Sequence, residues 1–230
     1  MTKRIIVTGA SNGIGEAIAK KLADNDYQVI LVARNKEKLE TITHEINKKS
    51  SKTAYFYQVD VSKEDQVERM INDVKENLGS IYGYVNNAGV MLNSELTKGD
   101  TASWDQMIDI NIKGVLYGTS LVIPDMIANE SGHIINIASV SGFEVTKTNT
   151  VYSATKFAVR AISQGLEKEL ARTGVRITNV SPGMVETKLS PNRQDMNRKP
   201  LEPADIANGV LYALSQPSYV NVNEITIRPN

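Results

Sequence analysis

Short apolar runs rich in β-branched residues alternate along this chain with longer segments of helical period, and this alternation constrains the fold more than any other feature. We expect strands at residues 4–8, 28–33, 54–59, 81–86, 133–138, 175–180 and 224–227. One intervening segment places Val67, Met70, Ile71, Val74 and Leu78 on one stripe of a helix, as in a helix that covers a sheet. Strands joined by crossover helices are almost always parallel and connected right-handedly. The pattern predicts an α/β fold with a doubly wound, seven-stranded parallel sheet and helices on both faces.

The bulk composition bounds the size and the partners of the protein. Its 230 residues suffice for one sizeable core, and no repeat divides them, so we expect a single domain over residues 1–230. Lys plus Arg and Asp plus Glu balance at 26 each, which gives no reason to expect binding to nucleic acid or to an acidic membrane surface. The lack of cysteine excludes disulfides and thiolate chemistry, and His44 and His133 lack the spacing of metal ligands. We expect a small molecule or cofactor as partner, and no metal.

The start of the chain gives the expected location. Lys3 and Arg4 precede an apolar run of only Ile5, Ile6 and Val7, which is too short for a signal peptide. No other segment approaches the roughly 20 apolar residues of a membrane span. We therefore expect a soluble, cytoplasmic protein.

A glycine-rich turn follows the first expected strand and opens a helix over residues 14–23. The turn reads Thr8-Gly9-Ala10-Ser11-Asn12-Gly13-Ile14-Gly15. Gly9 permits a tight turn, while Gly13 and Gly15 let a ligand approach the helix N-terminus, where unpaired N–H groups favour a pyrophosphate. The spacing differs from the usual dinucleotide fingerprint, and such glycines can serve sterics alone. Their position after the first strand favours a phosphate site.

The end of the second expected strand bears on the choice of nucleotide. A carboxylate at this place would bind a ribose 2′-hydroxyl, whereas an arginine would accept a 2′-phosphate. Ala33 offers no carboxylate, and Arg34 offers a planar fork of donors suited to phosphate. NADP(H) is therefore preferred over NAD(H). The alternative is that Arg34 only begins a solvated helix with Lys36 and Lys38.

Three residues in the second half of the chain form a candidate acid–base group. Tyr152 and Lys156 are four positions apart, so on a helix they share one face. A phenol has a pKa of about 10 and transfers protons poorly near neutrality unless a cation such as Lys156 favours its phenolate. Ser139 precedes Tyr152 by thirteen residues and can hydrogen-bond a substrate oxygen. A surface Tyr–Lys pair is the structural alternative, and Ser141 competes with Ser139.

Together these features resemble the short-chain dehydrogenase/reductase family, and the resemblance covers nearly the whole chain. Further matching segments are Asp60-Val61, Asn86-Asn87-Ala88-Gly89, Asn111 and Pro182-Gly183-Met184-Val185-Glu186-Thr187. The resemblance implies a Rossmann-type fold and an oxidoreductase that transfers a hydride between NADP(H) and a carbonyl or secondary alcohol, with Tyr152 as the general acid or base. The alternatives are a buried Asn111 that bends its helix and an Asn87 that only forms a turn.

The resemblance also implies roles for individual residues. The implied catalytic group is Ser139, Tyr152, Lys156 and Asn111, of which Asn111 supports a water relay from Lys156. Asp60 and Val61 would contact adenine, and Val185 and Thr187 the carboxamide of nicotinamide. The implied cofactor-binding residues are Gly9, Ser11, Asn12, Gly13, Ile14, Gly15, Arg34, Asp60, Val61, Asn87, Ala88, Gly89, Tyr152, Lys156, Pro182, Gly183, Val185 and Thr187.

The substrate end of the site is expected to be mostly apolar. The expected wall consists of Met91, Leu92, Phe143, Val145 and Met184. Residues 188–203, rich in proline, asparagine and charge, are expected to form a short lid. Basic residues in that lid, such as Arg193 and Lys199, suggest recognition of a carboxylate, although charges in a lid are usually solvated. A modest carbonyl compound or a 3-hydroxy acid is the expected substrate.

Two other functions remain open from the sequence. A 3-oxoacyl-carrier-protein reductase would share the catalytic residues, but it typically ends in a glycine-rich segment that the sequence following Asn221 lacks. A regulator that senses NADPH without catalysis would often lack the tyrosine that is present here as Tyr152. By analogy with the family we also expect a homodimer or homotetramer, packed through helices at residues 104–129 and 151–173.

Overall fold

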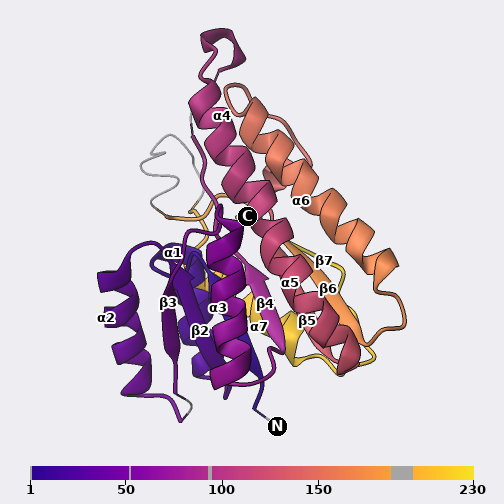
Figure 1. Cartoon of the computed structure of the whole chain (residues 1–230). Coiled ribbons are helices and arrows are strands. Elements are labelled where there is room, and N and C mark those ends of the chain that lie inside the picture. The colour runs from indigo at the N-terminus through magenta and orange to yellow at the C-terminus, as the bar shows by residue number, and fades with distance from the viewer. Residues whose placement is uncertain (1, 52, 93–94, 188–198) are drawn as a thin grey trace.

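A seven-stranded, wholly parallel sheet forms the centre of the computed structural model, in the strand order β3-β2-β1-β4-β5-β6-β7 (Figure 1). The structure describes residues 2–51, 53–92, 95–187 and 199–230. The strands are β1 (Arg4–Thr8), β2 (Gln28–Ala33), β3 (Tyr55–Gln58), β4 (Gly83–Asn86), β5 (Gly132–Ile137), β6 (Val175–Pro182) and β7 (Glu224–Ile227). The order reverses between β1 and β4, which is where ligands bind in doubly wound sheets. The predicted fold class is confirmed.

The helices lie on both faces of this sheet. They are α1 (Gly13–Ala23), α2 (Lys36–Asn47), α3 (Glu64–Asn77), α4 (Thr101–Ile108), α5 (Gly114–Ala128), α6 (Thr150–Glu169) and α7 (Pro203–Ser215). Two short 3₁₀ turns, η1 (Leu96–Lys98) and η3 (Val140–Gly142), and a π-helical turn, η2 (Asp109–Lys113), complete the described elements. None of the described helices is long and apolar enough to cross a membrane.

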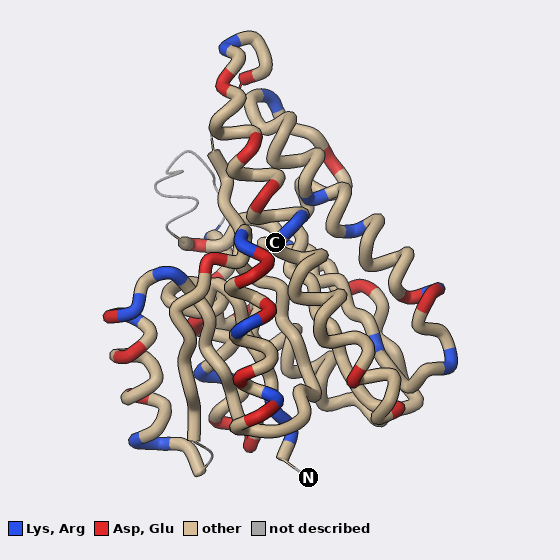
Figure 2. Tube along the Cα trace, viewed as in Figure 1, with Lys and Arg blue, Asp and Glu red and all other residues tan. Residues whose placement is uncertain are grey.

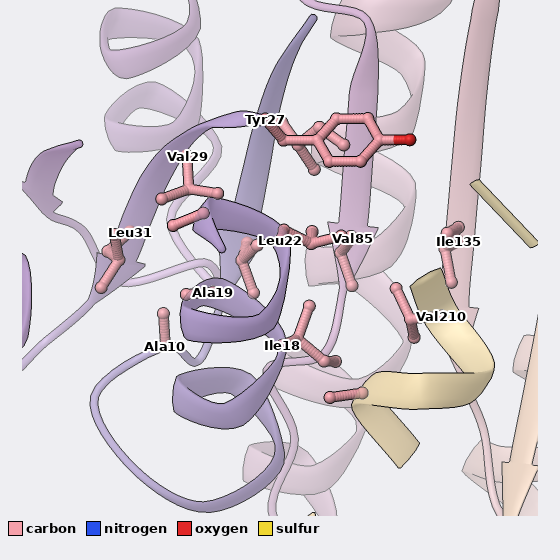
Figure 3. Packing of buried hydrophobic residues seen from close by; sticks show 14 of the residues in the cluster. Ala10, Ile18, Ala19, Leu22, Tyr27, Val29, Leu31, Val85, Ile135 and Val210 are labelled. Carbon is pink, nitrogen blue, oxygen red and sulfur yellow. The ribbon is translucent and has the colours of Figure 1, made fainter. Parts of the chain in front are cut away.

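The alternation of side chains in the strands creates two cores. Ile5 and Val7 of β1 belong to the core beneath α1, α2 and α7, whereas Ile6 belongs to the core beneath α3 and α5. Successive side chains of a strand point to opposite faces, so a strand buried on both faces is apolar throughout. Figure 3 shows the first core, where Ile18 and Leu22 of α1 pack together with Val210 of α7 and Val85 of the sheet. Both cores hold the strand ends, and hence the loops that follow them, in fixed positions.

Most strand boundaries agree with the prediction, and the differences have local causes. β3 and β4 begin later than expected, at Tyr55 and Gly83. β6 continues two residues further than expected, to Pro182, because its last residues pair with β7, with Pro182 opposite Ile227. This extension carries β6 into the loop that leads to the predicted nicotinamide-binding residues.

Two of the predicted helices differ from the structure, because one is interrupted and the other is shorter than expected. The expected helix over residues 104–129 is interrupted by the π-helical turn η2, which separates α4 from α5. The expected helix over residues 151–173 ends at Glu169, because Thr173 folds back and both its N–H and its hydroxyl donate to the carbonyl of Leu170. Figure 2 shows acidic and basic residues interspersed along the helices rather than gathered by sign.

Candidate active site

Loops at the carboxyl ends of the strands enclose a cavity of about 640 Å³. It receives residues from the loops after β1, β2, β3, β4, β5 and β6 and from the start of α6. Every residue named above as catalytic or cofactor-binding lines this cavity except Asn111. The structure therefore brings together residues that lie up to 178 positions apart, from Gly9 to Thr187.

The glycine turn has both a steric and a binding aspect. Gly9 has a φ of 67°, and a side chain there would lie 2.9 Å from the Cα of Ala88, so the turn packs against the loop after β4. A Cβ on Gly15 would collide with the carbonyl of Gly9. Gly13 has a φ of 55° and faces the cavity, where a Cβ would meet only Thr187 at 3.4 Å. Sterics thus explain Gly9 and Gly15, whereas the left-handed backbone of Gly13 favours glycine at a place where the cavity is open.

The N-terminus of α1 points its first turn at the cavity. The Asn12 side chain precedes the helix without capping it, and Gly13, Ile14 and Gly15 all line the cavity. The first N–H groups of a helix lack partners within the helix, and the helix dipole favours an anion beside them. This end of the cavity suits a phosphate or pyrophosphate group.

Thr8 joins the glycine turn to the loop after β4. Its hydroxyl donates to the carbonyl of Val85 at 3.0 Å and accepts from the N–H groups of Asn87 and Ala88, each at 3.0 Å. The Asn87 amide also donates to the carbonyl of Thr8 at 2.9 Å. Asn87 is therefore more than a turn former, because it locks two cavity walls together.

The end of the cavity beside β2, away from Ser139 and Tyr152, is basic. Arg34 is exposed at the end of β2, and Lys38 follows one turn later in α2, both in the cavity lining. The Asn35 side chain caps α2 by accepting from the N–H of Lys38 at 2.9 Å. The sequence pattern places Lys38 only in a solvated helix, although its spacing of four from Arg34 is a usable signal. Asp60 lies at the same end, where one carboxylate oxygen accepts from both the N–H and the hydroxyl of Ser62.

Ser139, Tyr152 and Lys156 meet where β5 ends and α6 begins. Ser139 follows β5, and its Oγ accepts from the N–H of Ser141 at 3.1 Å, which leaves the hydroxyl hydrogen for another acceptor. Tyr152 and Lys156 project from one face of α6 into the cavity, with Lys156 Nζ 5.9 Å from the centre of the phenol ring. Lys156 is 6% exposed and donates to the carbonyl of Ile137 at 2.9 Å.

Burial dominates the electrostatics of this group. It raises the pKa of Tyr152, and a side-chain hydrogen bond with Ser139 partly opposes the rise. It also lowers the pKa of Lys156 from 10.5 to about 8, because few groups replace the lost water around the ammonium. That Lys156 also lowers the pKa of Tyr152 stays a prediction.

Asn111 lies behind the cavity wall, in the π-helical turn η2. Its Oδ1 accepts from the N–H of Val90 at 2.8 Å, and its Nδ2 donates to the carbonyl of Val90 and to the hydroxyl of Thr155. This clamp ties the loop after β4 to α6, and π-helical turns often occur at such functional places. Both hydrogens of Nδ2 are used by these bonds, and the expected part of Asn111 in a water relay from Lys156 remains a prediction.

The substrate end differs in part from the expected apolar wall. Met91 and Met184 line the cavity, whereas Leu92, Phe143 and Val145 do not. Phe143 instead stacks on the guanidinium of Arg160, and Val145 is 60% exposed. The sequence interpretation missed the polar lining residues Thr146 and Asn149, and it considered Ser141 only as an alternative to Ser139. Their position between Ser139 and Tyr152 was the available signal.

The expected lid falls mostly outside the described residues. Residues 188–198 are not described, and they include Arg193. Of the remainder, Lys199 pairs with Glu202 at 2.8 Å, and Leu201 forms a parallel bridge with Val185. Pro203 is the first residue of α7, so the segment that leads away from the cavity ends one residue earlier than expected.

Comparison with known proteins places this site in a family. A family model described as short chain dehydrogenase matches residues 3–198. An uncharacterized oxidoreductase of Staphylococcus aureus (strain MRSA252) is 50% identical over 227 residues, which cover 99% of this chain and 97% of that protein. An uncharacterized oxidoreductase of Staphylococcus saprophyticus is 51% identical with the same coverage. The chain belongs to the short-chain dehydrogenase family and is an oxidoreductase of that family.

Solved structures agree in fold. The closed form of a serine dehydrogenase complexed with NADP⁺ is 32% identical with a TM-score of 0.90, over 97% of this chain and 94% of that one. An alcohol dehydrogenase from the archaeon Thermococcus sibiricus, complexed with 5-hydroxy-NADP, is 30% identical with a TM-score of 0.91, over 99% and 96%.

Proposed function

We propose that the protein transfers a hydride between NADP(H) and a carbonyl or secondary alcohol, with Tyr152 as the general acid or base. The observation that carries the proposal is a single cavity with Ser139, Tyr152 and Lys156 on one side and the glycine turn with Arg34 at its far end. The nicotinamide would supply or accept the hydride. All other steps belong to the chain itself.

Tyr152 supplies the proton in the direction of reduction. A carbonyl that gains a hydride develops negative charge on its oxygen, so a donor must point at that atom. The raised pKa of Tyr152 keeps its phenol protonated near neutral pH, which suits donation. The Ser139 hydroxyl can donate to the same oxygen and hold it beside the phenol.

Lys156 supports the same proton transfer through its positive charge. Its ammonium lies beside the phenol ring and stabilises a phenolate when the proton leaves. In the direction of alcohol oxidation Tyr152 must act as a base, which its raised pKa disfavours at neutral pH. Oxidation is therefore expected to speed up as the pH rises, and reduction to be favoured near neutrality.

Two basic residues favour NADP(H) as the cofactor. Arg34 and Lys38 border the end of the cavity where β2 stops, and Ala33 places no carboxylate there. Several structural relatives were solved with NADP or an NADP derivative, which supports the same choice. NAD(H) is proposed as the weaker cofactor.

A panel of aldehydes, ketones and hydroxy acids tests the proposal, with 4-nitrobenzaldehyde as an electrophilic probe and with NADPH and NADH measured side by side. We expect NADPH-dependent reduction of at least one simple carbonyl compound. Turnover of an acyl-carrier thioester alone would favour the carrier-protein reductase. Tight NADPH binding without turnover of any compound would favour the non-catalytic regulator. A cytoplasmic location and a homodimer or homotetramer complete the proposal.

A further inference from the structure

Arg160 on α6 holds the segment that follows Ser139, and it does so from outside the cavity. Its Nη1 donates to the carbonyl of Gly142, the last residue of η3, at 3.0 Å. Its guanidinium carbon lies 3.5 Å from the centre of the Phe143 ring. The Arg160 side chain is 19% exposed and does not line the cavity. Its contacts therefore act on the turn that carries Ser139 rather than on a ligand.

Glu224, the first residue of β7, fixes Arg160 from the other side. One carboxylate oxygen lies 3.6 Å from Arg160 Nε. The other accepts from Asn179 Nδ2 at 2.7 Å and from Ser181 Oγ at 2.9 Å, and both donors are buried in β6. The carboxylate is thus placed by the interior of the sheet, and it attracts the guanidinium as an ion pair, since among the described residues Nε has no hydrogen-bond partner.

Asn179 belongs to a row of polar side chains that crosses the sheet. Asn86, Asn136 and Asn179 are register partners in β4, β5 and β6, and Glu224 is the next partner in β7. Asn86 donates to Asn136 at 2.8 Å, and Asn136 donates to Ser163 Oγ at 2.9 Å. The Ser163 hydroxyl itself donates to the carbonyl of Val159 at 2.9 Å and lies 3.5 Å from Asn179 Oδ1. The three asparagines are at most 4% exposed. Asn179 is therefore restrained mainly by burial and by its bonds to Ser181 and Glu224, and this buried polar group gives Glu224 a defined position.

The same segment has a second, weaker tie to the C-terminal end of the chain. Glu144 and Arg228 form an ion pair at 3.1 Å, with side chains 65% and 50% exposed. Exposed pairs contribute little because water and salt screen them. This pair offers a matched control, since it joins the same segment to the region of β7 without the buried network.

We propose that Arg160 and Glu224 are positioning residues that hold η3, and through it the Ser139 hydroxyl, in the place where it reaches the Tyr152 phenol and the substrate oxygen. The inference rests on the proposed function. Ser139 Oγ is itself part of the turn, because it accepts from the N–H of Ser141, so a turn that shifts carries the hydroxyl with it.

Only arginine can make the three contacts at once. A planar guanidinium donates to the Gly142 carbonyl, stacks on the Phe143 ring and turns Nε toward Glu224. A lysine ammonium could replace one of these contacts but not all three. The conservative substitution should therefore rescue the position of η3 only in part.

The test combines hydrogen exchange with kinetics in the full chain. The variants are Arg160→Met, Arg160→Lys, Glu224→Gln and, as the control, Arg228→Met. Exchange is followed by mass spectrometry on peptides that contain η3, whose Gly142 and Phe143 amides are bonded within the turn. NADPH oxidation is measured with 4-nitrobenzaldehyde, and NADPH titration gives the Kd and the folded fraction of each variant.

We expect Arg160→Met to speed exchange in η3 and to lower kcat at least about tenfold while the NADPH Kd stays within about twofold. Arg160→Lys should fall between the wild type and Arg160→Met. Glu224→Gln can still accept from Asn179 and Ser181, but its amide would turn a donor toward Arg160. We therefore expect Glu224→Gln, like Arg160→Met, to speed exchange in η3 and to lower kcat. The double variant Arg160→Met with Glu224→Gln should have the same exchange rate in η3 and the same kcat as Arg160→Met, because Glu224 acts on η3 only through Arg160. Arg228→Met should behave as the wild type.

The outcomes separate this inference from the proposed function. Unchanged exchange in η3 for both Arg160→Met and Glu224→Gln would overturn the inference whatever the activity. Faster exchange with an unchanged kcat would overturn it as well, because η3 would then not need to be held for the reaction. A wild type that turns over no member of the panel would instead overturn the proposed function, and the exchange data would still report whether Arg160 anchors η3. If Arg160→Met does not fold, Glu224→Gln alone decides.

Discussion

Among the residues that the structure describes, a buried cation lies at each end of the parallel sheet, and the two differ in how many hydrogen-bond acceptors surround them. At the carboxyl ends of the strands, Lys156 is 6% exposed and donates to one acceptor among the described residues, the carbonyl of Ile137. At the opposite end, Arg176 of β6 is 5% exposed and donates to five acceptors. Equal burial thus accompanies very different degrees of pairing.

The partners of Arg176 explain its role. They are the carbonyls of Ala213, Leu214, Gln216 and Val220 and the hydroxyl of Tyr82, at 3.0 to 3.4 Å. The carbonyls lie at and beyond the end of α7, where unpaired carbonyls and the helix dipole favour a positive charge. Arg176 closes a structural network, whereas Lys156 keeps donors for a ligand and remains costly to bury. The comparison indicates that stability is concentrated at one end of the sheet and chemistry at the other.

The largest expected effect comes from removing the poorly paired cation. Lys156→Met should lower kcat about 100-fold or more, because the cation beside Tyr152 is lost. The same change should stabilise the protein by about 2 kcal/mol at pH 7, after allowing for the orphaned carbonyl of Ile137. Urea unfolding and steady-state kinetics measure the two effects.

The stabilisation expected for Lys156→Met depends on pH in a defined direction. The folded pKa of Lys156, about 8, lies below its ordinary 10.5, so the folded protein binds fewer protons than the unfolded chain between these values. The penalty is complete below pH 8 and disappears as the pH rises to 10.5. The advantage of Lys156→Met should therefore fade between pH 8 and 10.5, and an advantage that persists at pH 10.5 would contradict the account.

Removing the well-paired cation should have the reverse pattern. Arg176→Met leaves buried carbonyls without a donor and should lower the free energy of unfolding by about 4 kcal/mol. The kcat per folded molecule should not change, because Arg176 lies at the far end of the sheet. Arg69→Met is a control, since Arg69 pairs on the surface with Asp65 and should matter by less than about 1 kcal/mol. A loss of kcat with little loss of stability would break the comparison.

The buried His133, at the same end of the sheet as Arg176, should make the free energy of unfolding fall at acid pH. Burial, with smaller contributions from Arg176 and Lys3, lowers the pKa of His133 from 6.5 to about 3. The folded state therefore binds fewer protons between these values, and stability is complete above pH 6.5 and is lost as the pH falls toward 3. At pH 5 the loss should be about 2 kcal/mol.

A pair of histidine variants checks this fall in stability by urea unfolding at pH 7 and pH 5. His133→Gln keeps a nitrogen for the bond to Thr178 and should remove most of the pH dependence. His44→Gln on the surface of α2 should keep it. Equal pH dependence in the wild type and His133→Gln would assign the fall in stability to other groups.

The smallest expected effect concerns the choice of cofactor. Arg34→Ala and Lys38→Ala should each weaken NADPH binding about tenfold and leave NADH binding nearly unchanged, as the loss of one phosphate contact would. Lys36→Ala is the control, because Lys36 pairs with Glu40 and lies outside the cavity lining. Equal losses for NADPH and NADH would mean that these residues hold a part common to both cofactors.

The sequence was enough to predict the positions of the strands and most of the residues that line the cavity. Strand positions follow from β-branched runs, and the cavity residues cluster because parallel strands end at one edge. The π-helical turn at Asn111 was not predictable, since it depends on bonds to Val90 and Thr155, which are distant in sequence. The same holds for the stacking of Phe143 on Arg160 and for the closed network of Arg176. Those contacts join elements that only the tertiary fold brings together.

The most direct test of the account is the Tyr152→Phe variant, assayed for NADPH-dependent reduction of the best panel substrate and for NADPH binding. The change removes one hydroxyl from the cavity and leaves the ring and its packing. The account predicts a kcat lower by about 10² to 10⁴ with an NADPH Kd close to that of the wild type. Full reductase activity in Tyr152→Phe would contradict the assignment of Tyr152 as the proton donor.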